Sequence, residues 1–523
     1  MRRFWFAALL LATGGCGNVG SGGAGDGGEG VAAVQPSRVT PEELRAAADD
    51  PRLVRFYEGR GWQPAWNAET ARGLIAAIGG AARHGLDPRL FLGEAEGAQA
   101  PAEREAALTL AALTYAEALA RGRADPQRLA EVYTVARPNP NVAAGLNGAL
   151  EQGDVARWLE GLAPQDEEYR RLSEAYVAAR QQGGGQAAAP IPAGAAIRPG
   201  ASDARLPAIA AALRAQGYVQ AGAQPARPSQ GDPKQKAAAP PAARYTAELV
   251  AAVRGLQEDH GLEANGVIGA DTLAALNHGA LDRARTLAVN MERRRWLPRE
   301  APPTRIDVNI AGAYLTYWRD SAVADRRRVV TGQPGNETPE LGSPMFRLVA
   351  NPTWTVPESI AEEEILPKGP GYMARNNMVL RDGRIIQDSG PENSLGLVKF
   401  DMKNDQAIYL HDTPAKALFA TDERHRSHGC VRVQDALGFA RLIAQQEGVL
   451  EEWDRALATE EETFVPLPRE IPVRLLYQTA FLDGGRLRFR PDVYGWDDAV
   501  AAALGFPARP RSARSGHVAD VGP

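Results

Sequence analysis

The spacing of apolar residues changes once along this chain, from a helical repeat to a strand-like alternation. Leu and Ala recur every three or four residues from Thr40 to about Arg180, whereas apolar and polar residues alternate in 305–310 and 313–318. Between these regions, residues 181–243 contain Gly-Gly-Gly, alanine repeats and several prolines, a composition that favours a linker over a packed core. Helices and strands with these two patterns do not share a single hydrophobic core. At about 100–200 residues per domain, the length of 523 residues predicts two to four domains.

The sequence therefore predicts a multidomain α+β protein. A helix-like piece at 207–216 interrupts the linker, and we expect mostly β structure from 303 to 498, a mixed-sheet sandwich with short helices. We divide the chain, in order, into a leader at 1–16, a flexible tether at 17–35, a helical domain at 36–180, the linker at 181–243, a small three-helix unit at 244–279, a connecting helix at 280–302, the β-rich domain at 303–498 with an insertion at 351–395, and a tail at 499–523.

Composition and charge exclude several classes of function. The net charge of −5, with a pI of about 5.9 and no basic run, argues against nucleic acid as the main partner. Two cysteines form no disulfide framework and are too few for zinc modules built on paired cysteines. Cys16 and Cys430 must therefore each be explained singly.

Cys16 ends a segment with the features of an export signal. Two arginines follow Met1, an apolar run extends from Phe4 to Ala12, and small residues precede the cysteine. This run is far shorter than the roughly 20 residues that span a bilayer, and no other stretch reaches that length. Small residues before a cysteine resemble a bacterial lipobox, although Thr13 stands where that pattern usually has leucine. We expect export to the periplasm or cell envelope, with membrane contact only through a lipid on Cys16; simple secretion with a free thiol is the alternative.

Residues 244–279 carry the pattern of a small helical unit. An amphipathic segment at 248–257 is stopped by Gly261, a turn follows at 265–269, and Asp271 caps a second helical stretch. The first helix, the run HGLEANGVIG and the run DTLAALN, in this order, resemble the peptidoglycan-binding module of cell-wall enzymes. An ordinary three-helix packing unit satisfies the same pattern.

The second cysteine, Cys430, stands among histidines: His411, His425 and His428 lie within 20 residues of it. A thiol has a reference pKa of about 8.5 and becomes a strong nucleophile when a neighbouring imidazole takes its proton, which leaves a thiolate–imidazolium pair. His411 and His428 are both candidates for that base, and an imidazole on a neighbouring strand approaches a thiol more freely, which favours His411. A zinc site built from the three histidines and Cys430 is the chemical alternative, although it lacks paired-cysteine or His-Glu-x-x-His spacing.

These residues resemble the L,D-transpeptidase family, in which a histidine is followed about 14–17 residues later by Ser/Thr-His-Gly-Cys. Here 15 residues separate His411 from Ser427, the first residue of Ser-His-Gly-Cys. Asp412 stands where many members have glycine and agrees with the large, multidomain branch. Further runs resemble that branch: WQPAW at 62–66 in its helical scaffold domain, VNI at 308–310, NPTW at 351–354, NSLG at 393–396, KF at 399–400 and YLHDTP at 409–414.

The resemblance implies a scaffold domain, a peptidoglycan-binding module and an L,D-transpeptidase domain with a capping insertion. Cys430 would attack a peptidoglycan stem tetrapeptide, expel its terminal D-alanine and form a thioester, and an amine of a neighbouring stem would take the acyl group in a 3→3 crosslink. The resemblance implies that His411 is the proton donor and acceptor and that His428, Gly429 and Ser427 shape the site. It further implies that Arg432 and the Gly429 region support the oxyanion. The implied substrate contacts are Arg432, Tyr409, Trp354 and Tyr372.

The resemblance implies no cofactor and no metal. Two alternatives stay open: hydrolysis of the same thioester by water, which would make the enzyme an L,D-carboxypeptidase, and a non-catalytic lipoprotein that binds the cell wall through its module.

Overall fold

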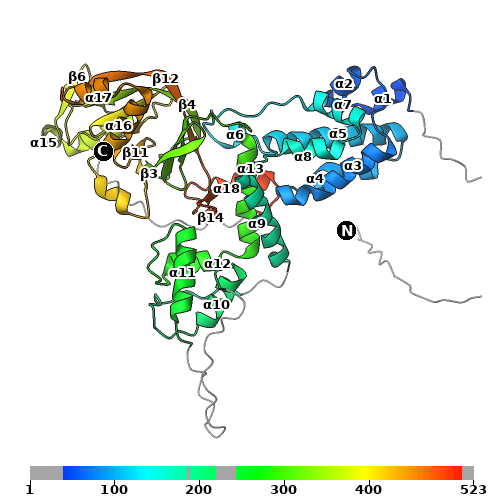
Figure 1. Cartoon of the computed structure of the whole chain (residues 1–523), viewed down its shortest axis with the longest axis horizontal. Helices are drawn as coiled ribbons and strands as arrows, with labels where there is room; N and C mark the ends of the chain where they lie inside the picture. The colour runs from blue at the N-terminus through cyan, green and yellow to red at the C-terminus, as the bar shows by residue number, and fades with distance from the viewer. Residues whose placement is uncertain (1–38, 185–188, 220–242, 509–523) are drawn as a thin grey trace, which may run out of the picture. The chain divides into compact units, whose positions relative to one another are not determined.

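The computed structural model describes residues 39–184, 189–219 and 243–508 (Figure 1). The predicted leader, the tether and Cys16 lie outside these ranges, and the predicted tail is described only as far as residue 508. Within the described ranges, no helix combines the length and the apolar character that crossing a membrane requires.

The N-terminal part is helical, as the leucine and alanine repeat predicts. Its elements are α1 (Pro41–Ala47), α2 (Pro51–Glu58), α3 (Ala68–Gly79), a 3₁₀ turn (Gly80–His84), α4 (Arg89–Gly97), α5 (Pro101–Arg121), α6 (Pro126–Leu129), α7 (Val142–Gln152), α8 (Val155–Leu162) and α9 (Glu167–Gly183). The first helix starts at a capping box, in which the Thr40 hydroxyl accepts a hydrogen bond from the Glu43 amide and the Glu43 carboxylate accepts one from the Thr40 amide. Helix α5 is the central element, because it packs against α1, α2, α3, α4, α7 and α8.

Three helices around one apolar core form the small unit that follows: α10 (Leu206–Ala215), α11 (Ala247–Asp259) and α12 (Ala270–Asn277) (Figure 1). The same core includes Ile191 and Ile197, and Ile197 exchanges two backbone hydrogen bonds with Ile268, of 3.1 and 3.0 Å. The unit therefore reaches into the range 181–243, which the composition assigns to a linker. Proline, glycine and alanine dominate that range, and a core of this size needs only a few larger apolar side chains.

Helix α13 (Ala280–Trp296) leads from the small unit to the β-rich domain and is buried along most of its length. Its charged side chains are paired: Arg295 donates to Glu292 at 2.5 Å, and Arg293 donates to Asp497 at 2.5 Å. Buried charges are tolerated where each one keeps a partner and further hydrogen bonds. Asp497 begins α18 (Asp497–Ala503), which packs on α13, so a packed helix crosses the predicted start of the tail at residue 499.

Nine strands pair as one sheet in the described part of the C-terminal domain. They are β1 (Arg305–Asn309), β2 (Tyr314–Arg319), β3 (Ala322–Gly332), β4 (Leu341–Ala350), β8 (Val398–Met402), β9 (Leu410–His411), β10 (His425–Ser427), β11 (Val431–Val433) and β12 (Thr463–Leu476), in the order β10-β3-β11-β9-β8-β4-β12-β1-β2. Strand β3 pairs with β2 through residues 322–328 and with β11 and β10 through residues 329–332. Because β3 also pairs with β2, the last strand of this order, the sheet closes on itself, and the predicted mixed-sheet sandwich is corrected to a closed mixed sheet.

The closed sheet and two helices, α16 (Ala436–Glu447) and α17 (Leu450–Leu457), form the main core of this domain. Residues 351–395 form a separate substructure with a small core of its own, which we call the cap. The cap consists of β5 (Trp354–Thr355), α14 (Glu358–Ile360), a π-helical turn (Ala361–Ile365), a 3₁₀ turn (Leu366–Lys368), α15 (Pro370–Arg375), β6 (Met378–Arg381) and β7 (Arg384–Gln387). A 3₁₀ turn (Lys416–Ala420) and the hairpin of β13 (Ala480–Asp483) and β14 (Arg486–Phe489) complete the domain.

Candidate active site

A tight turn between β10 and β11 presents Cys430. The Ser427 hydroxyl donates to the Cys430 carbonyl at 2.5 Å and accepts from the Gly429 amide at 3.3 Å, and the Ser427 carbonyl accepts from the Gln333 amide at 2.9 Å. Gly429 has a φ of 110°, a conformation that residues with a side chain rarely adopt. Ser427 and Gly429 therefore shape the turn, and Cys430 follows it directly.

The pairing of β9 with β11 places Cys430 and His411 on the same face of the sheet. The two strands run parallel, with His411 opposite Arg432, and the Val431 amide donates to the Tyr409 carbonyl at 3.1 Å. Side chains two residues apart on a strand point to the same side, so Cys430 and Arg432 share a face with Tyr409 and His411. Extended by one residue, this register puts Cys430 opposite Tyr409 and diagonal to His411.

Both members of this pair are neutral at rest. Burial, together with the nearby Arg432, lowers the pKa of His411 to about 3. Burial also raises the pKa of the Cys430 thiol above its usual value, although Tyr409, Lys399 and Arg432 act in the opposite direction. His411 Nδ1 has no hydrogen-bond partner among the residues that the structure describes. The resting site therefore holds a protonated thiol and an unprotonated imidazole, in place of the thiolate–imidazolium pair considered above.

Tyr409 forms one wall beside the thiol. Its hydroxyl interacts with the side chains of Cys430 and Trp354, and its ring lies 5.7 Å from that of His411. The Lys399 ammonium lies 4.4 Å from the centre of the Tyr409 ring. Lys399 belongs to the KF run that resembles the family, but the sequence did not predict it as a site residue, because the neighbour of a strand lysine across the sheet is not evident from spacing.

The His428 side chain contacts the cap. Its Nε2 lies 2.5 Å from an oxygen of Glu364, which belongs to the π-helical turn of the cap. His428 thus connects the cap to the loop that contains Cys430. Glu364 was also missed from the sequence, where it ends a run of three glutamates typical of an exposed helix.

The remaining predicted contacts lie at or near the cap. Trp354 is buried in the cap core, and Tyr372 packs against that core with the Lys368 ammonium 4.6 Å from its ring centre. Tyr409 packs against the same cluster from the sheet side, so the cap core is continuous with the wall beside Cys430. Arg432 is buried on β11 between β3 and β9.

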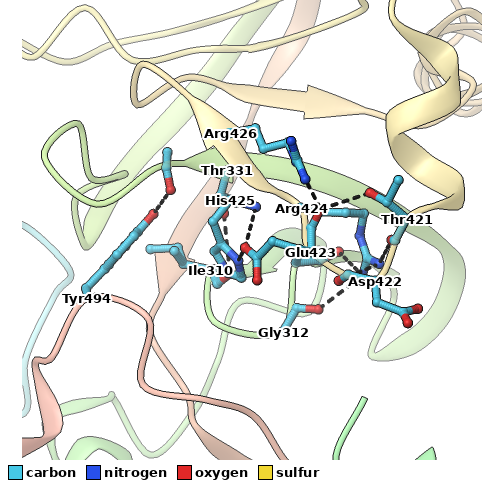
Figure 2. Close-up of polar contacts among 12 residues, drawn as sticks. Ile310, Gly312, Thr331, Thr421, Asp422, Glu423, Arg424, His425, Arg426 and Tyr494 are labelled. Carbon is cyan, nitrogen blue, oxygen red and sulfur yellow. Dashed lines mark hydrogen bonds and ion pairs between the residues drawn. The ribbon is translucent and has the colours of Figure 1, made fainter. Parts of the chain in front are cut away.

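His425 anchors the start of the cysteine loop (Figure 2). Its Nδ1 lies 2.7 Å from a Glu423 oxygen and its Nε2 lies 3.1 Å from the Ile310 carbonyl, while the Thr331 amide donates to the Arg424 carbonyl at 2.9 Å. Two of the three histidines considered as zinc ligands, His425 and His428, therefore have separate partners. In the described ranges, no group of three His, Cys, Asp or Glu side chains lies close enough to hold a metal ion.

Comparison with known proteins assigns the three parts of the chain. Residues 51–175 match the family model of a scaffold domain, residues 211–276 match "Putative peptidoglycan binding domain", and residues 303–450 match the L,D-transpeptidase catalytic domain. Residues 303–450 therefore carry the catalytic domain of the L,D-transpeptidase family. The second match includes most of α10 as well as α11 and α12, in line with the core that these helices share.

A curated relative of this chain is the "Putative L,D-transpeptidase" of Haemophilus influenzae, 32% identical over 242 residues. The alignment covers 42% of this chain and 49% of the relative, about half of its length. Among solved structures, the L,D-transpeptidase–avibactam carbamoyl enzyme and a mutant of the Enterococcus faecium L,D-transpeptidase each have 14% identity and a TM-score of 0.19, and cover 34% of this chain and 51% and 52% of theirs. The Xylanimonas cellulosilytica L,D-transpeptidase has 16% identity and a TM-score of 0.16, and covers 54% of this chain and 98% of its own.

Proposed function

We propose that this chain is a peptidoglycan L,D-transpeptidase in which Cys430 is the nucleophile and His411 the proton donor and acceptor. The observation that carries the proposal is the parallel pairing of β9, which contains His411, with β11, which directly follows Cys430, the only thiol of the matched catalytic domain. The His411 imidazole is buried and unprotonated, which supports its role as the base. A neutral imidazole accepts the thiol proton as the sulfur attacks, so no stable thiolate is needed before substrate arrives.

The reaction has two acyl-transfer steps. In the first, Cys430 Sγ bonds to the carbonyl carbon of the third residue of a stem tetrapeptide, its proton passes to His411, and the carbon–nitrogen bond to D-alanine breaks as His411 returns the proton to the leaving amine. In the second, an amine of another stem attacks the thioester, its proton passes through His411 to the departing sulfur, and a 3→3 crosslink forms. Arg432, Lys399 and Tyr409 border the thiol and are placed to contact the donor stem.

The other parts of the chain suit work in the cell wall. We place the protein in the periplasm or cell envelope, held by a lipid on Cys16 and by its peptidoglycan-binding module. The cap, with Trp354 and Tyr372, covers the donor stem, and the Glu364–His428 contact keeps it on the cysteine loop.

Muropeptide analysis of the purified full chain with tetrapeptide muropeptides tests this function. Crosslinked dimers that have lost one D-alanine support the transpeptidase. Tripeptide monomers as the sole product would indicate a carboxypeptidase. No product from a chain that still binds sacculi would support the non-catalytic wall-binding protein.

Wall binding is expected to depend on a groove of about 750 Å³ along α11, lined by Arg244, Arg254 and Glu258 among others. Exposed guanidinium groups suit the carboxylates of stem peptides. Replacing Arg244 and Arg254 together with alanine should weaken sacculus binding at least several-fold in a pull-down with Cys430→Ala as background. Arg180→Ala, which removes an exposed charge from α9, should bind as the parent does; equal binding by the double variant would exclude this groove as the site.

A further inference from the structure

The hydroxyl of Thr338 joins the end of β3 to the cysteine loop. Thr338 is fully buried in the segment between β3 and β4. Its hydroxyl accepts a hydrogen bond from the Gly332 amide at 2.8 Å and donates one to the Gly429 carbonyl at 2.8 Å. An amide can only donate, so the single hydroxyl proton is directed to the Gly429 carbonyl.

This bond sets the orientation of the peptide unit that links Gly429 to Cys430. In a planar trans peptide the carbonyl and the N–H point in opposite directions. With the Gly429 carbonyl held toward Thr338, the Cys430 amide points to the other side of the loop. Within the described ranges, that amide donates to no protein acceptor. It belongs to the residue whose sulfur bonds to the substrate carbonyl, so it can reach an oxygen on that carbon.

We infer that Thr338 is a positioning residue, which orients the Cys430 amide as a donor to the oxyanion formed during thioester formation. The inference rests on the proposed function. Gly429 alone does not fix this peptide unit, because its φ of 110° lies in a range that glycine explores freely. The hydrogen bond from Thr338 to the Gly429 carbonyl restricts the rotation of this peptide unit. The Cys430 amide is therefore oriented as a donor before substrate binds.

Tyr494 offers a matched control, because it forms hydrogen bonds with Gly332 and Thr338 but none with Gly429. Its hydroxyl donates to the Gly332 carbonyl at 2.6 Å and accepts from the Thr338 amide at 3.3 Å. Figure 2 shows Tyr494 beside the segment that leads into the loop. Tyr494→Phe therefore disturbs the support of Thr338 while the Gly429 bond stays in place.

Two rates measured on the full chain separate orientation from folding. The first is acylation of Cys430 by a soluble tetrapeptide muropeptide, followed by intact mass in a single turnover. The second is alkylation of Cys430 by iodoacetamide, followed by peptide mass; this displacement needs the sulfur but forms no oxyanion. For Thr338→Val, which keeps the shape without the hydroxyl, we expect acylation to fall about 10²-fold, the low end of the loss for one oxyanion donor, with alkylation close to the parent rate. Thr338→Ser should restore the parent ratio, and Tyr494→Phe should keep it.

Several results would overturn this role for Thr338. They are a parent-like ratio of the two rates in folded Thr338→Val, a parallel fall of both rates, or an equal fall of the ratio in Tyr494→Phe. Should the valine variant not fold, Thr338→Ala removes the same hydroxyl without crowding. A parent-like ratio of the acylation rate to the alkylation rate in Thr338→Ala would also overturn the role. A parent chain that is alkylated but never acylated would instead contradict the proposed transpeptidase function itself.

Discussion

Cys430→Ala should abolish both the crosslinked muropeptides and the covalent acyl-enzyme. Loss of a nucleophile costs on the order of 10⁶ in kcat in a well-studied serine protease, which is a loss below detection in a muropeptide assay. Alanine leaves Tyr409, Lys399 and His411 in place, yet none of them supplies a sulfur for the thioester. Mass spectrometry of products and of the intact chain gives both readouts.

The variant should fold normally, which makes its inactivity informative. The residue Cys430 is only partly buried, and the hydrogen bond of its thiol to the Ala407 carbonyl is long, at 3.8 Å. Removing such a group changes stability by roughly 0.5 kcal/mol or less, so the thermal midpoint and sacculus binding should stay close to those of the parent. Cys16→Ala, the matched loss of the chain's other thiol, should retain full crosslinking in a purified reaction. Crosslinks made by Cys430→Ala would contradict the assignment of the nucleophile.

Local sequence patterns predict the parts of this molecule whose structure depends on near neighbours. The helical repeat predicts the N-terminal helices, and the capping box at Thr40 marks where the first one begins. The spacing from His411 to Cys430 leaves room for a strand, a loop and a return, and β9, which contains His411, pairs in parallel with β11, which directly follows Cys430. Both inferences need only local periodicity or one strand pairing.

Features that depend on distant residues were not predictable. Closure of the sheet requires β3 to pair with strands on both of its sides, and alternation along one strand contains no such information. The Glu364–His428 contact joins residues 64 apart, and the Thr338–Gly429 bond joins residues 91 apart. The neutral state of the resting pair depends on burial, which spacing does not reveal.

His411→Gln should reduce acylation of Cys430 by about 10²–10⁴-fold near neutral pH, the usual contribution of a general base. Glutamine keeps a polar side chain of similar reach but does not take a proton from the thiol. His428→Gln should have a smaller effect that falls on substrate binding, because His428 contacts Glu364 of the cap and not the thiol. Single-turnover acylation as a function of muropeptide concentration separates the two effects. An equal loss of the chemical step in both variants would contradict the choice of His411.

The pH profile gives the sharpest distinction between parent and His411→Gln. With a pKa of about 3, His411 is unprotonated from pH 5 upward, so the parent rate should vary little with pH until the thiol itself ionises. In the glutamine variant the sulfur must ionise before it attacks. Burial raises the pKa of that thiol, so the thiolate fraction and the rate should rise about tenfold for each pH unit across the neutral range. The ratio of the parent acylation rate to that of the variant should therefore fall as the pH rises. Parallel pH profiles would show that the His411 imidazole does not receive the thiol proton.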